Sequence, residues 1–241
     1  RYYYERICDE IKQTLIGTRK LYYDLMSQPS RSLYILFKHI KCDFEKKVVD
    51  LRKAEHFSEE FEAINRLKKV PVIDHNGLIL TESVAIVNYL SRENIIPDNL
   101  YPKESKQRAR VEEFLEWHHA GLRLHCAMFF RVKVETPKSL QGYQRRMEAA
   151  LTEFDTKWLG RGNDFVTGNN VTVADLFAAC EVEQPKMAGY DPCEHYENIN
   201  VWLKKVREHF NPYYDEGHWR VDKRSIADSG PGPGAPPDLM P

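Results

Sequence analysis

The fold is decided by the stretch Leu21-Tyr-Tyr-Asp-Leu-Met-Ser-Gln-Pro-Ser-Arg31, an apolar run that passes into a polar turn. Residues 20–26 are mostly apolar and aromatic, as in a buried strand. After the turn, apolar residues from Leu33 to Ile40 recur at the spacing of one buried helix face. The stretch therefore predicts a strand that leads directly into a helix.

Further strands are expected on the C-terminal side of this unit. Residues 44–50 form an apolar and charged run that predicts a second strand. Two more runs, at 70–74 and 78–81, flank His75-Asn76-Gly77, whose Asn-Gly pair is a strong hairpin signal. Helical spacing returns from Ser83 to Leu90. The order of strand, helix, strand, hairpin and helix predicts a small α/β domain.

Beyond Pro102 the pattern becomes helical throughout. Apolar residues keep a 3.6-residue period over 111–129, which predicts one long helix, and again over 140–158. Thr172-Val-Ala-Asp175 is a variant of the capping box, with Asp in place of the usual Glu, and marks the start of another helix. A further helix is expected around residues 199–206. This half of the chain predicts an all-helical domain.

The change of period places the domain boundary at residues 97–104. The expected fold class is α/β plus all-α, with an α/β domain of residues 20–97 and a helical bundle domain of residues 104–227. Residues 1–19 are expected to be an N-terminal extension. Residues 228–241, of which eight of fourteen are Gly or Pro, predict a disordered tail.

Composition excludes several classes of function. The 241 residues carry 35 Lys and Arg against 36 Asp and Glu, a balance that argues against binding nucleic acid or an anionic membrane. The five cysteines are scattered and never form a C-x-x-C pair, which excludes a disulfide scaffold and a cysteine-rich zinc site. No apolar run approaches the roughly 18 residues that a membrane helix needs. We therefore expect a cytoplasmic protein with reduced thiols.

Ser27 stands where the first strand meets the first helix. A helix N-terminus presents unpaired N–H groups and a positive dipole end, which favour an anion such as a thiolate. Ser27 and Ser30 have the spacing at which redox proteins of the thioredoxin type carry two cysteines. Because both residues are serines here, disulfide exchange through this pair is impossible. A serine hydroxyl can instead donate to a bound thiolate, and lowering a thiol pKa by two units needs about 2.7 kcal/mol. The alternative is that both serines only cap the helix.

Four segments in order resemble the cytosolic glutathione transferases, and most closely their theta class. They are Leu21–Arg31, Asn65-Arg-Leu-Lys-Lys-Val-Pro71, Leu80-Thr-Glu-Ser-Val-Ala-Ile86 and Thr172-Val-Ala-Asp-Leu176. The resemblance runs from about Leu21 to Asp228. It implies the glutathione S-transferase (GST) fold, in which a thioredoxin-like N-terminal domain binds glutathione and a C-terminal helical bundle domain shapes the second-substrate pocket.

The resemblance also implies roles for single residues. Ser27 matches the residue that activates the glutathione thiol. Val70 matches the residue before a cis proline, here Pro71, whose backbone N–H and C=O pair with the peptide like an added strand. Glu82 and Ser83 begin a helix where they would hold the γ-glutamyl amino group and carboxylate.

Three more positions are carried over from the family. His56 and Lys69 match residues that hold the glycyl end of glutathione, and Arg123 matches a theta-like arginine that reaches from the helical domain towards the tripeptide. One position departs from the family, because relatives usually have Asn-Pro where this chain has Asn65-Arg66. That departure predicts a more mobile loop and leaves the affinity for glutathione open, but not the chemistry.

The expected function is the transfer of the glutathione thiolate to an electrophilic carbon of a small hydrophobic substrate, with glutathione peroxidase activity as a second reaction. Glutathione is a cosubstrate, and neither a metal nor a prosthetic group is expected. His118, His119 and His125 lack both an H-E-x-x-H pattern and an acidic partner at ligand spacing. His118 and His125 fall on the apolar face, so for these two residues core packing or pocket lining is favoured over a metal site. The family resemblance implies a homodimer. The alternative is a non-catalytic binding or assembly module with the same fold.

Overall fold

The computed structural model describes residues 19–135, 140–219 and 221 of the chain. The predicted tail of residues 228–241 and residues 1–18 of the expected extension lie outside the described residues. Strand β1 (Arg19–Tyr23) begins at Arg19, the last residue that the sequence assigned to the extension. It also ends earlier than the predicted strand, because the chain turns after Tyr23 towards the first helix.

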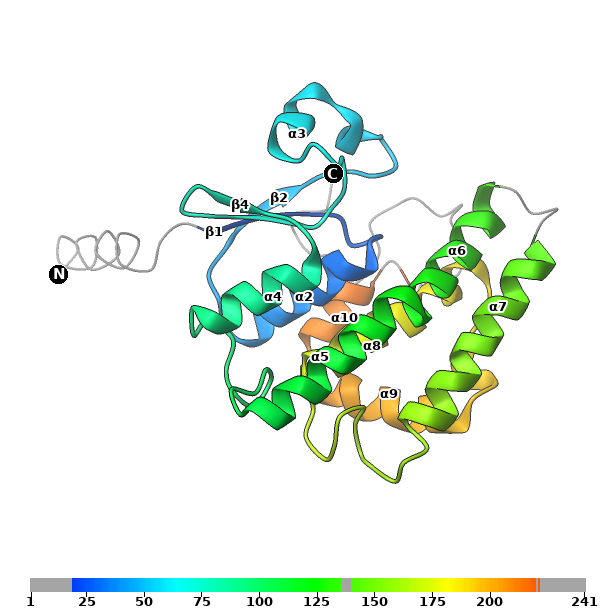
Figure 1. The fold of residues 1–241 in the computed structure, drawn as a ribbon. Coiled ribbons are helices and arrows are strands. Elements are labelled where there is room, and N and C mark those ends of the chain that lie inside the picture. Colours follow the sequence, from blue (N-terminus) through cyan, green and yellow to red (C-terminus); the bar gives the residue numbers. More distant parts are fainter. Residues whose placement is uncertain (1–18, 136–139, 220, 222–241) are drawn as a thin grey trace.

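The described residues form one four-stranded sheet in the order β2-β1-β3-β4 (Figure 1). Strand β2 (Glu45–Val48) runs parallel to β1, whereas β3 (Val72–His75) and β4 (Leu78–Leu80) continue the sheet antiparallel. The predicted hairpin is confirmed. Asn76 and Gly77 both have positive φ, 55° and 87°, the backbone that a tight turn between twisted strands requires.

Helices cover both faces of this sheet. Helices α2 (Gln28–His39) and α4 (Ser83–Arg92) lie on one face, and α3 (Glu59–Ile64) lies on the other (Figure 1). Both faces need cover because the side chains of a strand such as β1 alternate between the two faces of the sheet. Leu21 and Tyr23 are fully buried in the main core, while Tyr22 packs against Phe61 of α3 with ring centroids 6.3 Å apart.

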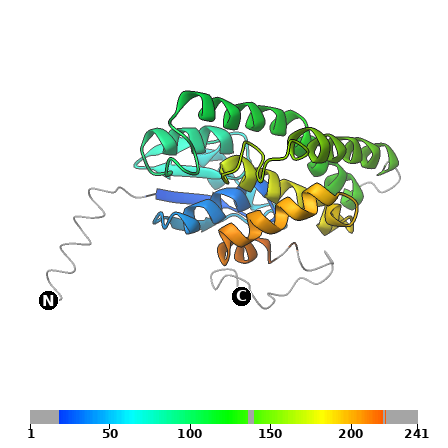
Figure 2. The same cartoon turned by 90° about the horizontal axis from the view of Figure 1, so that it is seen from below.

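The second half of the described chain is helical. Its helices are α5 (Ser105–Ala120), α6 (Leu122–Glu135), α7 (Leu140–Glu153), α8 (Val173–Val182), α9 (Glu197–Phe210) and α10 (Tyr213–His218). A π-helical turn, Phe154–Trp158, extends α7. These helices lie beside the sheet and its helices in two perpendicular views (Figures 1 and 2). No helix of the described residues is long and apolar enough to cross a membrane.

The prediction of one long helix over residues 111–129 was wrong. The chain breaks at Gly121, whose φ of −94° and ψ of −93° separate α5 from α6. A Cβ atom at this position would lie 2.9 Å from the carbonyl oxygen of Trp117, so the close approach requires glycine. The apolar period continues through the break because both helices face the core, where Phe114 and Cys126 are completely buried.

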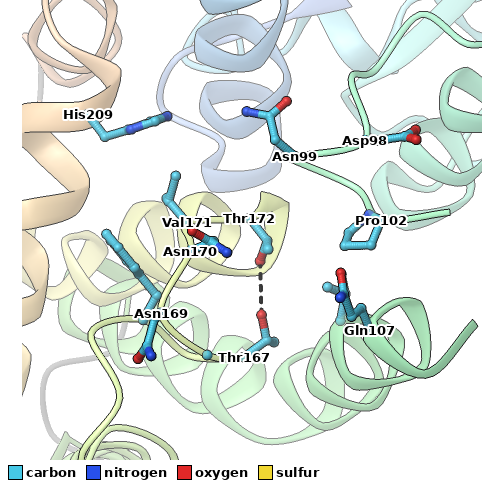
Figure 3. A pocket seen from close by; sticks show the side chains of 13 residues that line it. Asp98, Asn99, Pro102, Gln107, Thr167, Asn169, Asn170, Val171, Thr172 and His209 are labelled. Atoms are coloured by element: carbon cyan, nitrogen blue, oxygen red, sulfur yellow. Dashed lines mark hydrogen bonds between the residues drawn. The ribbon is translucent and has the colours of Figure 1, made fainter. Parts of the chain in front are cut away.

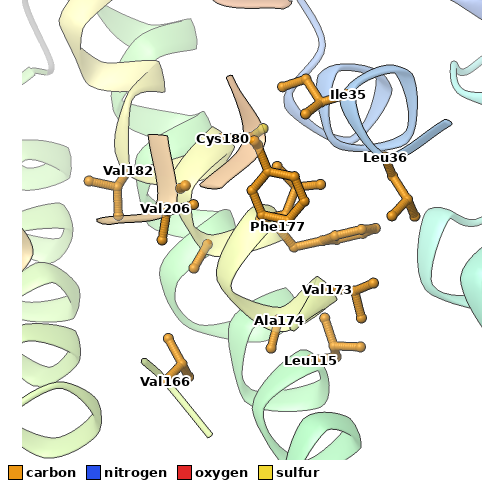
Figure 4. Packing of buried hydrophobic residues seen from close by; sticks show 14 of the residues in the cluster. Ile35, Leu36, Leu115, Val166, Val173, Ala174, Phe177, Cys180, Val182 and Val206 are labelled. Atoms are coloured by element: carbon orange, nitrogen blue, oxygen red, sulfur yellow. The ribbon is translucent and has the colours of Figure 1, made fainter. Parts of the chain in front are cut away.

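Helix α8 is the centre of the molecule, because every residue from Val173 to Val182 is buried. Phe177 and Cys180 of α8 face Ile35 and Leu36 of α2 (Figure 4). Eight of its ten residues are apolar, and the two others, Asp175 and Glu181, are buried carboxylates, a composition that places the helix in the core. The predicted capping box at its start is confirmed, with the Asp175 carboxylate accepting the backbone N–H of Thr172 at 2.9 Å.

The contact between α2 and the helical half positions the functional site. The sheet and its helices use residues up to Arg92, and the helical half begins at Ser105, with the intervening segment joining them. We propose residues 97–104 as the domain boundary. Across it, Arg31 of α2 is completely buried and donates to the carbonyl of Cys180 at 2.8 Å. The first turn of α2 is thereby held against α8.

Candidate functional site

Ser27 is the N-cap residue of α2 and is half-buried. Its backbone N–H donates to the carbonyl of Asp24 at 3.0 Å. The Asp24 carboxylate accepts the N–H groups of Met26 and Leu51, both at 2.8 Å, and so ties the turn to the loop after β2. Sequence reasoning missed Asp24. Its signal is an aspartate directly after a strand, the residue type that forms such side-chain turns.

The Ser27 hydroxyl faces the backbone of Val70. Its Oγ donates to the Val70 carbonyl oxygen at 3.4 Å, although the two residues are 43 positions apart. The Val70–Pro71 peptide bond is cis, as the family resemblance implied. The helix end and the loop before β3 therefore meet at one point.

Five of the predicted site residues line one cavity beside this point. The cavity has a volume of about 190 Å³, and its lining includes Lys69, Val70, Glu82, Ser83 and Arg123. The remaining lining residues are Pro29, Asn65, Leu67, Pro71, Thr81 and His119. Ser27 itself is not a lining residue, but it is hydrogen-bonded to one.

His56 is the predicted residue that the structure does not bring to the cavity. It lies in the 3₁₀ turn Glu55–Phe57, where its ring is 3.9 Å from that of Phe57. Its Nδ1 is buried and has no hydrogen-bond partner among the described residues. A role for His56 at the glycyl end of a bound tripeptide therefore stays a prediction.

The loop that carries Lys69 and Val70 is held by Asn65. This side chain is 3% exposed, donates to the Lys69 carbonyl at 2.7 Å and accepts the N–H of Leu67 at 3.0 Å. Arg66, the departure noted in the sequence, is exposed and takes no part in these two hydrogen bonds. The predicted effect of Arg66 on loop mobility stays a prediction.

Glu82 and Ser83 form the entrance to helix α4. Glu82 precedes the helix with φ of 64° and ψ of 108°, a conformation that non-glycine residues rarely adopt. Such backbone conformations cluster at functional sites because the surrounding fold must enforce them. Ser83 begins the helix and lines the cavity, so the positive end of the α4 dipole lies at the cavity, with the acidic Glu82 as its N-cap residue.

The helical half contributes Arg123 and His119 from either side of the break at Gly121. Arg123 is in the first turn of α6 and forms an ion pair with the buried Glu181, with Nε and Oε2 3.9 Å apart. His119 was not singled out for the site by sequence reasoning, since an exposed histidine on a helix carries no specific signal.

His118 belongs to the core rather than to a metal site. It is 3% exposed and packs near Phe114 and Phe177, with ring centroids 5.8 and 6.5 Å away. Burial, with a smaller contribution from the Arg123 charge, lowers the pKa of His118 to about 3, so its ring is neutral. Within the described residues, no group of three or more His, Cys, Asp or Glu side chains could hold a metal ion.

A second and larger cavity lies away from this site. It has a volume of about 580 Å³ and is lined by Asp98, Asn99 and Pro102, by Gln107 and Val111 of α5, by Phe165, by residues 167–172 and by His209 (Figure 3). None of the predicted site residues lines it. The smaller cavity is therefore the candidate site, because two cations and an acidic residue line it and Ser27 is hydrogen-bonded to one of its lining residues.

Comparison with known proteins gives two family models that match the chain. They are the glutathione S-transferase N-terminal domain, over residues 19–92, and the C-terminal domain, over residues 99–209. Glutathione S-transferase theta-1 of Bos taurus is 37% identical to this chain over 196 residues, which cover 78% of this chain and 81% of the relative. Glutathione S-transferase theta-2 of Homo sapiens is 38% identical to this chain over 195 residues, which cover 78% of this chain and 80% of the relative.

Solved structures agree with these relatives. Human glutathione-S-transferase T1-1 in its apo form has a TM-score of 0.80 at 35% identity, covering 84% of this chain and 89% of that one. A human theta-class transferase in complex with the glutathione conjugate of 1-menaphthyl sulfate has a TM-score of 0.79 at 34% identity, covering 85% and 87%. The expected fold class, a thioredoxin-like domain followed by a helical domain, is confirmed. The chain belongs to the glutathione S-transferase family and is an enzyme of the theta type.

Proposed function

We propose that the 190 Å³ cavity binds glutathione and that Ser27 activates its thiol. The observation that carries the proposal is the Ser27 hydroxyl at 3.4 Å from the Val70 carbonyl, at the N-terminus of α2 and at the edge of the cavity. A cysteinyl group lying along Val70 would bring its sulfur to this hydroxyl. The hydroxyl and the helix dipole would then stabilise the thiolate over the thiol.

The charges that line the cavity are complementary to glutathione. The tripeptide carries two carboxylates and one ammonium group, besides its thiol. Lys69 and Arg123 supply two positive charges, and Ser83 stands at the N-terminus of α4, where a carboxylate is favoured. Glu82 supplies the negative charge for the ammonium group. We assign Lys69 and His56 to the glycyl end, and Glu82, Ser83 and Arg123 to the γ-glutamyl side.

The reaction that follows is a nucleophilic substitution or addition. The thiolate forms a carbon–sulfur bond with an electrophilic carbon, and the leaving group takes the bonding electron pair or, in an epoxide, becomes an alkoxide that takes up a proton. The protein contributes thiolate stabilisation and the proximity of two bound reactants. Glutathione is the cosubstrate, and hydrophobic electrophiles are the proposed second substrates. A hydroperoxide would instead be reduced to an alcohol and water by two glutathione molecules, which give up two electrons and become the disulfide.

The alternative, a non-catalytic binding or assembly module, is not favoured. The relatives are glutathione S-transferases of the theta class, and one similar structure holds a product-like glutathione conjugate. The chain also keeps a serine at the position where the thiol would be activated.

Turnover of a small substrate panel tests the proposed function. With glutathione in excess, we expect the protein to conjugate an alkyl halide or an epoxide, and to reduce an organic hydroperoxide. Product formation is measured by mass spectrometry and glutathione consumption, against a heat-inactivated sample as control. Binding of S-methylglutathione without turnover of any member of the panel would favour the non-catalytic module instead.

We also propose a homodimer in the cytoplasm. Large apolar side chains remain exposed on the α/β domain, including Phe57 at 61% and Leu78 at 45%, and such groups support a protein contact. The cysteines of the described residues are free, in keeping with a reducing compartment. Light scattering is expected to give twice the mass of one chain at micromolar concentration. A mass of one chain over that range would contradict the dimer.

A further inference from the structure

Glu181 is a buried carboxylate that the proposed chemistry does not use. It lies on α8 with its side chain 1% exposed. Its Oε1 accepts a hydrogen bond from Gln28 at 3.0 Å, and Gln28 is the residue after Ser27. Its Oε2 lies 3.9 Å from the Nε of Arg123. Glu181 therefore stands between the helix that begins at the activating serine and the arginine that lines the cavity.

Glu181 is the charged partner of Arg123 in this structure. Its side chain is 34% exposed and lines the cavity, yet its Nε is buried and finds no hydrogen-bond acceptor among the described residues. A long arginine side chain loses considerable rotamer freedom when it is held in one place, and a buried N–H without an acceptor is unfavourable. The negative charge of Glu181 offsets both the lost rotamer freedom and the missing acceptor. A small neighbouring cavity, lined by Gln28, Arg123 and Glu181 among others, joins these groups.

We propose that Glu181 is a positioning residue that holds Arg123 at the glutathione cavity and so strengthens glutathione binding without touching the tripeptide. The inference rests on the proposed function, because it takes glutathione as the ligand of that cavity. It adds a group from the core of the helical domain that acts through Arg123.

The surroundings of Glu181 make this interaction sensitive to pH. The charged and titratable groups around it are Arg31 on α2, His118 and His119 on α5, Arg123 and Cys126 on α6, Cys180 on α8 and Glu183 at the C-cap of α8. The neutral amide of Gln28 on α2 also faces it. Burial raises the pKa of Glu181 to about 7, against the opposing pull of Arg123 and Arg31.

The other buried groups hold their charge state near neutrality. The pKa of His118 falls to about 3, that of Glu183 falls to about 2, and that of Cys180 rises to about 12. Burial also raises the pKa of Cys126. Below pH 7 Glu181 therefore gains a proton, and Arg123 no longer faces a negative charge. Above pH 7 Glu181 is ionised and the ion pair with Arg123 forms. Glutathione binding is expected to strengthen as the pH rises through this range.

Calorimetric binding of S-methylglutathione tests the inference, because this thioether has no thiol to titrate. From about pH 6 to about pH 8 we expect the wild-type Kd to fall roughly fivefold, the scale of one coupled side-chain pair. Glu181→Gln should raise the Kd at the higher pH by a similar factor and should remove the pH dependence. His119 also lines the cavity, so His119→Gln must retain the pH dependence.

A double-mutant cycle separates positioning from a general structural effect. In the Arg123→Ala background, Glu181→Gln should change the Kd by less than about twofold, because its partner is already absent. Glu183→Gln is the matched control. It removes a buried charge at the C-cap of the same helix, but Glu183 pairs with Lys186 at 2.8 Å and accepts a hydrogen bond from Tyr214 at 2.6 Å, so the Kd should not change.

The outcomes are distinguishable. If wild type binds S-methylglutathione but Glu181→Gln has the same Kd and pH dependence, or if its effect persists without Arg123, the positioning role is wrong. If wild type does not bind the thioether at either pH, the proposed function itself fails. Should Glu181→Gln not fold, wild type and Arg123→Ala still decide, since only wild type is expected to show the pH dependence.

Discussion

Ser27→Ala is expected to lower kcat/KM for glutathione conjugation by about twenty-five-fold near neutral pH, the change in thiolate fraction when a thiol pKa rises from about 6.5 to about 8.5. The variant removes the hydroxyl that lies at the N-terminus of α2, beside Val70, while the helix dipole remains. A loss of two pKa units of thiolate stabilisation corresponds to about 2.7 kcal/mol. The measurement is steady-state kinetics with an alkyl halide, together with ultraviolet difference absorbance of the bound thiolate.

Two controls locate the effect at Ser27. The Kd for S-methylglutathione should change by less than about threefold, because the lost interaction is made by the thiolate. Ser30→Ala tests the neighbouring hydroxyl, which is completely buried and has no hydrogen-bond partner among the described residues. A large loss with Ser30→Ala but not with Ser27→Ala would transfer the role to Ser30. An unchanged rate and unchanged thiolate absorbance for Ser27→Ala would refute thiol activation by this residue.

Arg31→Ala is expected to lower the free energy of unfolding by about 3–5 kcal/mol. The guanidinium is completely buried and donates to the carbonyl of Leu25 at 2.8 Å, to the carbonyl of Cys180 at 2.8 Å and to the side chain of Gln184 at 2.6 Å. Its removal leaves these acceptors without a donor and leaves a cavity between the two halves of the molecule. Urea unfolding at one fixed protein concentration measures the change.

Arg110→Ala provides the matched control for this loss. Arg110 is 66% exposed and pairs with Glu113 at 2.7 Å on the surface of α5. An exposed pair of this kind contributes little, so the free energy of unfolding should change by less than about 1 kcal/mol. If Arg31→Ala destabilises no more than Arg110→Ala does, the buried arginine does not join the two halves as described.

Much of the fold could be predicted from short stretches of sequence. The Asn76-Gly77 turn and the Thr172–Asp175 capping box are confirmed. Both could be predicted because each depends on residues within three or four positions. The break at Gly121 was missed for a related reason. The apolar period continues across it, and the approach of Trp117 that requires glycine is visible only in three dimensions.

The candidate site also contains residues that the sequence predicted and residues that it missed. The sequence, by its likeness to a family, pointed to Ser27, Lys69, Val70, Glu82, Ser83 and Arg123, and Ser27 lies beside a cavity that the others line. His56 was also predicted, but it is not a lining residue. His119 and Asp24 were missed, because an exposed histidine and a strand-end aspartate are common in any protein.

By itself the sequence determined the strands, turns and caps and the order of the two halves, since periodicity and capping act between near neighbours. Only the tertiary structure decided how the halves are joined and what surrounds Arg123. Arg31 meets Cys180 and Gln28 meets Glu181 across 149 and 153 residues, respectively. Polar contacts at such separation leave no periodic trace in the sequence, because what brings the partners together is the packing of α2 on α8.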